Sequence, residues 1–85
     1  MNIKMKDFDL PVEYKGEEIT FRTSLLTYGF THKFQIDING QEIFFEPDEE
    51  RNYRATIPYE EIGYQKNVDP ELLKIIANTL KQLMS

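Results

Sequence analysis

The chain has 85 residues and a formal net charge of −5, with 40% apolar and 29% charged residues, so we expect one domain spanning residues 1–85. It has no cysteine, which excludes disulfides, thiolate metal sites and thiol nucleophiles. Its first ten residues, MNIKMKDFDL, are too charged for a signal peptide and no apolar run reaches membrane-spanning length, so a soluble cytoplasmic protein without membrane contact is predicted.

The first half of the chain is predicted to form consecutive antiparallel strands, because apolar and polar residues alternate between turn signals. The expected strands are about 7–14, 17–28, 31–38 and 41–46. Three two-residue loops separate them, at Lys15-Gly16, at Gly29-Phe30 and at Asn39-Gly40. Asn-Gly is typical of a type I′ turn, and a glycine at the first loop position is typical of a type II′ turn.

These loops also predict the register of the strands. The expected apolar pairs are Val12 with Ile19, Leu10 with Phe21, Leu25 with Phe34, Thr23 with Ile36, Phe21 with Ile38, Ile36 with Ile43 and Phe34 with Phe45. All of them lie on one face, and a slip of one residue would turn a strand over. On the other face we expect Arg22 opposite Asp37, Lys33 opposite Glu46 and the like-charged Asp37 opposite Glu42.

The second half adds one strand and one helix. The turn EPDEER precedes a strand at about 51–57, and Asp69 and Pro70 are typical of the N-cap and first position of a helix over about 70–84. The helix has an apolar stripe made of Leu72, Leu73, Ile76, Leu80, Leu83 and Met84. We therefore predict an α+β fold, an antiparallel meander of about five strands covered on one face by the C-terminal helix, with the linker 58–68 closing one end of the core.

No catalytic, metal or cofactor site is predicted. His32 is the one histidine, and it is interpreted as a structural residue bonding turn backbone rather than as an acid–base catalyst beside a carboxylate. The acidic run 46–50 lacks EF-hand spacing and is interpreted as a solvated turn. The carboxylates of the polar sheet face lack the buried cleft that a paired-carboxylate hydrolase needs, so they are interpreted as solvating groups.

The polar sheet face carries the candidate interaction residues. Phe44 and Leu26 fall on it by parity, and Arg22, Arg54 and Lys33 share it. Aromatic and aliphatic side chains flanked by arginine resemble an interaction hot spot. The alternative is that these apolar side chains are ordinary surface residues, or that they pack under residues 1–6 or under the linker.

The run YGFTHKFQIDINGQEIFFEPDEERNYRA, residues 28–55, resembles short uncharacterised bacterial proteins that share a hairpin followed by an FEPDEERNYRA-type segment. The resemblance covers about the middle third of the chain. It implies a stand-alone domain, and it implies no activity, cofactor or residue role.

Three functions remain open from the sequence. The first is a non-catalytic domain that binds a protein partner or forms a homodimer through its sheet edges or the Phe44 face. The second is binding of single-stranded nucleic acid by Tyr53, Arg54, Phe44 and Lys33, against which the excess of acidic residues argues. The third is an enzyme that uses His32 with a nearby carboxylate.

Overall fold

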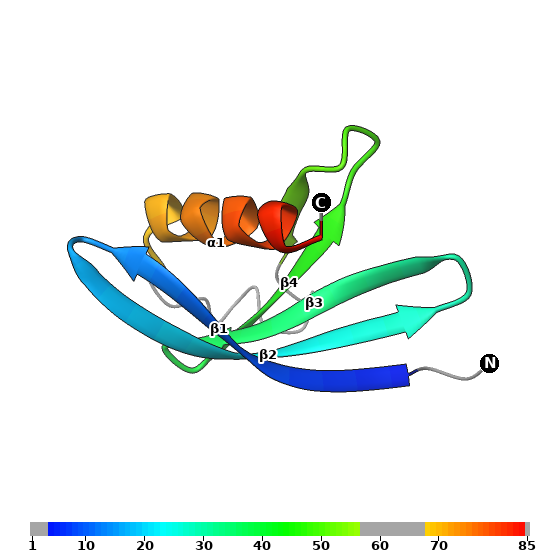
Figure 1. Cartoon of the computed structure of the whole chain (residues 1–85), viewed down its shortest axis with the longest axis horizontal. Coiled ribbons are helices and arrows are strands. Elements are labelled where there is room, and N and C mark those ends of the chain that lie inside the picture. Colours follow the sequence, from blue (N-terminus) through cyan, green and yellow to red (C-terminus); the bar gives the residue numbers. More distant parts are fainter. Residues whose placement is uncertain (1–3, 57–67, 85) are drawn as a thin grey trace.

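The fold is a five-stranded antiparallel sheet with one helix across it, as the sequence predicts. The computed structural model describes residues 4–56 and 68–84 (Figure 1). The strands follow chain order in the sheet, β1 (Lys4–Tyr14), β2 (Glu17–Tyr28), β3 (Thr31–Ile38), β4 (Gln41–Pro47) and β5 (Tyr53–Thr56), and the helix is α1 (Pro70–Leu83). Strand β1 begins earlier than expected and β5 is shorter than expected. The prediction that the linker 58–68 closes one end of the core falls on residues that, apart from Val68, lie outside the described ranges.

All three predicted hairpin turns are present. Lys15 and Asn39 have φ values of 51° and 54°, and the glycines that follow them also have positive φ, which is the type I′ pattern. In the third turn Gly29 alone has a positive φ, 60°, as a type II′ turn requires. The Asn39-Gly40 turn is further closed by the Asp37 carboxylate, which accepts a hydrogen bond from the Gly40 N–H at 2.8 Å.

The register agrees with the prediction except at one end of the β2–β3 ladder and one end of the β3–β4 ladder. Strands β3 and β4 pair Ile36 with Ile43 and Phe34 with Phe45, but the ladder between β2 and β3 stops at Thr23 and Ile36. The predicted pairs Phe21 with Ile38 and Arg22 with Asp37 are therefore wrong. The predicted pair Lys33 with Glu46 is also wrong, because the ladder between β3 and β4 stops at Phe34 and Phe45. On the other side of β2, Arg22 lies opposite Asp9 of β1. Strand twist accumulates along a long hairpin, so the β1–β2 hairpin swings away from β3, as Figure 1 shows.

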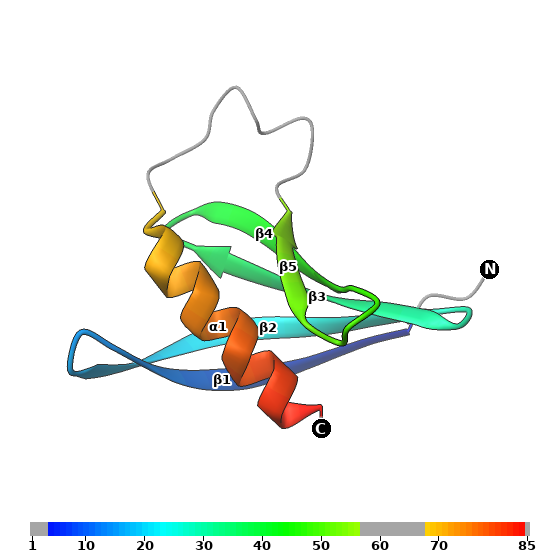
Figure 2. The ribbon, with the colours of Figure 1, turned by 90° about the horizontal axis from the view of Figure 1, so that it is seen from above.

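The core lies between the sheet and α1. Its fully buried apolar side chains come from β3, β4 and α1, namely Phe34, Ile36, Ile38, Ile43, Phe45, Ile76 and Leu80, and Thr23 of β2 is fully buried beside them. The end of the helical stripe differs from the prediction, since Leu83 and Met84 are about half exposed (54% and 48%). Viewed from above, the last turn of α1 reaches past the edge strand β1 (Figure 2).

Both ends of α1 are tied to the sheet. The Asp69 carboxylate caps the first turn by accepting a hydrogen bond from the Glu71 N–H at 2.9 Å, and it also accepts one from the Tyr14 hydroxyl of β1. At the other end the Lys81 ammonium donates to the Asn52 side-chain oxygen at 2.7 Å, in the loop between β4 and β5. The helix is thus tied to β1 at its start and to the β4–β5 loop near its end.

The Tyr14–Asp69 contact shifts the acidity of both groups. The hydrogen bond from Tyr14, aided by the Glu71 N–H, lowers the pKa of Asp69 below its ordinary 3.8. The same hydrogen bond to a carboxylate, together with desolvation, raises the pKa of Tyr14 above its ordinary 10.0. Near neutral pH the carboxylate is therefore charged and the phenol is protonated, which is the combination that the contact needs.

Candidate functional sites

The predicted interaction face is more closed than the sequence suggests. The Lys33 ammonium lies 4.3 Å from the centre of the Phe44 ring, a cation–π contact. Phe44 is half-buried, and Leu26, which pairs with Lys33 in the register, is only 8% exposed. The apolar side chains of this face are therefore mostly shielded from solvent.

The two arginines of that face lie apart from Phe44 and from each other. The Arg22 guanidinium forms ion pairs with Asp9 (3.2 Å) and Asp7 (3.9 Å) of β1. Arg54, on β5, lies opposite Glu46 of β4. It is three strands away from Arg22, which corresponds to about 14 Å across the sheet at normal strand spacing. The structure thus gathers Lys33, Leu26 and Phe44 but not the full predicted set.

The residues predicted to bind nucleic acid fall on both faces of the sheet. Phe44 and Arg54 lie on the face that no described element covers, whereas Tyr53 packs against the core beneath α1. One strand of nucleic acid cannot stack on both faces at one place, so these residues form no single binding track.

His32 is held by an aromatic neighbour rather than by turn backbone. Its Nε2 lies 2.7 Å from the Tyr53 hydroxyl, and its ring packs edge-on against Tyr53 and Phe34. Partial burial raises the pKa of Tyr53, so the hydroxyl stays protonated near neutral pH and can donate to the imidazole. Among the described residues no carboxylate or nucleophile is hydrogen-bonded to His32.

The His32–Tyr53 pair forms one wall of a cleft that the sequence did not predict. The cleft encloses about 340 Å³ and is lined by His32, Pro47, Asp48, Arg51, Tyr53, Lys81 and Met84. These residues come from the start of β3, the β4–β5 loop and the end of α1. Because these segments are far apart along the chain, no local sequence pattern indicates the cleft. The one available signal in the sequence was the presence of His32.

The β4–β5 loop folds around Asp48. One Asp48 carboxylate oxygen accepts hydrogen bonds from the Glu50 and Asn52 N–H groups, both at 2.9 Å, and the Asp48 N–H donates to the Asn52 carbonyl at 2.8 Å. This is the turn chemistry expected of the acidic run. Within residues 4–56 and 68–84 no group of three or more acidic, histidine or cysteine side chains could hold a metal ion.

The end of the sheet beyond α1 exposes apolar side chains. Phe30 in the β2–β3 turn is fully exposed, and Met5 near the start of β1 is 64% exposed. Figure 1 shows this hairpin and the start of β1 projecting together past the end of the helix. We call residues 4–6 and 25–34 the sheet end. It contains no acidic residue and three lysines, in a chain that has fifteen acidic residues.

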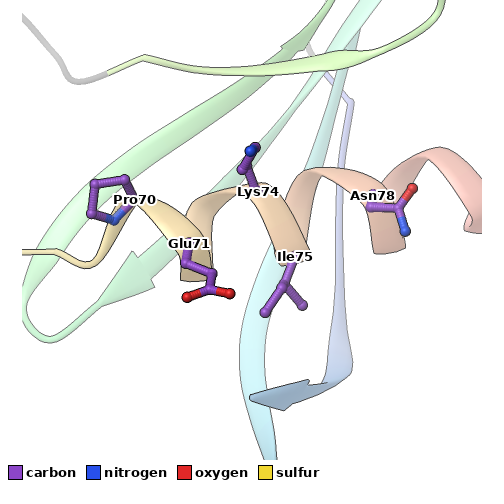
Figure 3. Close-up of a pocket in the computed structure, with 5 residues that line it drawn as sticks. All are labelled: Pro70, Glu71, Lys74, Ile75 and Asn78. Atoms are coloured by element: carbon purple, nitrogen blue, oxygen red, sulfur yellow. The ribbon is translucent and has the colours of Figure 1, made fainter. Parts of the chain in front are cut away.

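The outer face of α1 carries a hollow without the features of a site. Its lining residues are Pro70, Glu71, Lys74, Ile75 and Asn78, all from one helix. In Figure 3 Glu71 and Ile75 point to one side of the helix and Lys74 points to the other. Side chains that diverge in this way cannot enclose a ligand.

Comparison with protein-family models, with curated proteins and with solved structures finds no match for this chain. In the part of the chain that the structure describes, no helix is long and apolar enough to cross a membrane. The function is therefore argued from the two features that the geometry assembles, the sheet end and the cleft.

Proposed function

We propose that this protein is a non-catalytic interaction domain, and that its sheet end binds a protein segment that combines acidic and apolar residues. The observation that carries the proposal is the exposure of Phe30. Only Gly29 needs its particular residue type for the turn, because Gly29 has the positive φ. The fold therefore does not require an aromatic side chain at position 30, and an exposed aromatic is the usual anchor of a protein interface.

The charge of the sheet end defines the partner. Lys33 shares one face of the sheet end with Met5, whereas Lys6 lies on the other face beside Leu25. The nearest acidic residue along β1, Asp7, already receives a hydrogen bond from Ser24 and lies near Arg22. An acidic partner would meet cations at this end and carboxylates over most of the remaining chain. Complementary charge of this kind favours one orientation of docking and speeds association.

A photocrosslinking experiment tests the proposal directly. The photoreactive residue p-benzoylphenylalanine replaces Phe30 in the full chain, expressed in the cells that naturally produce the protein. We expect one covalent adduct, with an acidic protein, and its reduction by Lys33→Glu on the face that Met5 shares. The matched control places the same residue at Asn78, which is exposed on the outer face of α1. The same adducts from both positions would contradict the proposal.

Two measurements on the isolated protein distinguish the proposed protein partner from a second copy of the chain and from nucleic acid. Sedimentation velocity should show a monomer, and a dimer abolished by Phe30→Ser would assign the sheet end to a second copy instead. Titration with a fluorescent single-stranded oligonucleotide at low salt should show no binding, because the chain is acidic as a whole. Binding that depends on Phe30 would replace the protein partner by nucleic acid.

A further inference from the structure

We infer that the cleft between the β4–β5 loop and the end of α1 is a binding site for a small organic monoanion, a carboxylate carried on an apolar body, held by Arg51 and Lys81 against Tyr53 and Met84. The cleft shares His32 with the sheet end but does not include Phe30, and the inference does not depend on the function proposed for the sheet end.

The shape of the cleft fits a small ligand. Its volume of about 340 Å³ lies at the lower end of the range of small-molecule sites. Apolar surface comes from Tyr53, Pro47 and Met84, while the polar groups are few. An apolar wall with a few polar groups is the usual composition of a ligand pocket.

The charges that face the cleft favour an anion with a single charge. Arg51 and Lys81 are cationic, and Asp48 is the one carboxylate in the lining. The Asp48 carboxylate is engaged by two backbone N–H groups. Lys81 also offsets the negative end of the α1 dipole, so Arg51 supplies the net positive charge. A carboxylate matches this balance better than a doubly charged phosphate does.

Arg51 is the residue most directly available to the ligand. Among the described residues the guanidinium of Arg51 has no ion pair, and that of Arg54 has none either, whereas Arg22 has two. The backbone of Arg51 adopts φ of 66°, a left-handed conformation that a residue other than glycine or asparagine adopts at some cost. The chain thus keeps an arginine where glycine would fit the backbone better, and a planar guanidinium can bind a carboxylate through two parallel hydrogen bonds.

The walls of the cleft are held in place before any ligand arrives. The hydrogen bond from Lys81 to Asn52 links α1 to the loop, and the bond between His32 and Tyr53 links β3 to β5. The bonds to Asp48 close the loop that carries Arg51. A site held in this way loses little conformational freedom on binding.

The test is an NMR titration of the full chain labelled with [methyl-¹³C]methionine, with phenylacetate as the probe. Met84 lines the cleft and Met5 does not, so of the three methionine methyls that of Met84 reports the site and that of Met5 is an internal control. We expect a saturable shift of the Met84 methyl and none of the Met5 methyl. The neutral analogue 2-phenylethanol should bind at least about tenfold more weakly, as loss of a charge-assisted hydrogen bond predicts.

Variants of equal charge then identify the anion-binding group. Arg51→Gln should weaken phenylacetate binding about tenfold, whereas Lys74→Gln on the outer face of α1 should leave it unchanged. Arg51→Gly removes the guanidinium and suits the positive φ, so it should lose binding in a protein that stays folded. Absence of a Met84 shift, an equal response to 2-phenylethanol, or equal losses in Arg51→Gln and Lys74→Gln would overturn the inference.

Discussion

The β3–β4 and β2–β3 hairpins both have alternating apolar and polar residues around a two-residue loop, but they differ in how far α1 covers them. The β3–β4 hairpin lies beneath α1, and its helix-facing residues Ile36, Ile38, Ile43 and Phe45 have no exposed surface. The β2–β3 hairpin ends beyond the helix, and its turn exposes Phe30 fully. The comparison teaches that the side chains facing the helix are buried where α1 covers them, whereas the turn beyond the helix leaves Phe30 exposed and available for binding.

Truncation of a covered side chain should have the largest effect. Phe45→Ala should reduce the free energy of unfolding by about 3–5 kcal/mol, because the ring is fully buried and its loss leaves a cavity. Denaturant unfolding followed by circular dichroism measures the change. The matched variant Met5→Ala at the sheet end should change stability by no more than about 0.5 kcal/mol. Similar losses in both variants would show that the sheet end is packed in solution.

Glycine substitutions test whether the stability of a turn depends on its position relative to α1. Gly29→Ala and Gly16→Ala should each cost about 1–2 kcal/mol, because both glycines have positive φ. No atom lies within 4 Å of a Cβ added at either position, so the backbone alone sets the cost. The two unfolding free energies should therefore fall by similar amounts. A much smaller loss at Gly29 would mean that the uncovered turn is not formed in solution.

The contact that fastens α1 to β1 should make the covered region sensitive to pH. The lowered pKa of Asp69 stabilises the fold above about pH 4, and this contribution is lost as the pH falls below that value. The raised pKa of Tyr14 stabilises the fold below about pH 10, and this contribution is lost as the pH rises further. The stability difference between wild type and Tyr14→Phe should therefore be largest between these limits, as thermal unfolding across pH would measure.

Tyr53 provides the control for the alkaline limit. Burial raises the pKa of Tyr53 as well, so the Tyr14→Phe variant should still lose some stability at high pH. At acid pH the difference in stability between this variant and wild type should disappear. A difference between wild type and Tyr14→Phe that stays constant from acid to alkaline pH would show that the Tyr14–Asp69 hydrogen bond does not form.

Replacement of Phe30 should have the smallest effect on stability. Phe30→Ser should change the free energy of unfolding by less than about 0.5 kcal/mol, since the ring is fully exposed and Gly29 maintains the turn. Equilibrium unfolding in urea checks this. A loss above 1 kcal/mol, on the order of a cavity-forming change, would mean that the ring packs on the fold and is not free for a partner.

Local patterns predicted the elements well because each depends on neighbouring residues. Asn39-Gly40 sets its turn through the φ preferences of two residues, and Asp69 caps α1 through its own side chain. The predicted interaction face was harder to judge, because parity places Phe44 and Leu26 on the correct face but does not show that Lys33 lies over Phe44. The cleft could not be predicted at all, since His32, Arg51 and Lys81 are far apart along the chain.

The sequence by itself determined the hairpins, their apolar face and the helix that covers it, because alternation, turn chemistry and capping act over a few residues. Only the tertiary structure decided where the long β1–β2 hairpin leaves β3 and where α1 ends above the sheet. Those two outcomes depend on strand twist and on the fit of the helix against it, which are properties of the assembled layers. They are also what leaves Phe30 exposed and brings Arg51, Tyr53 and Lys81 to one cleft.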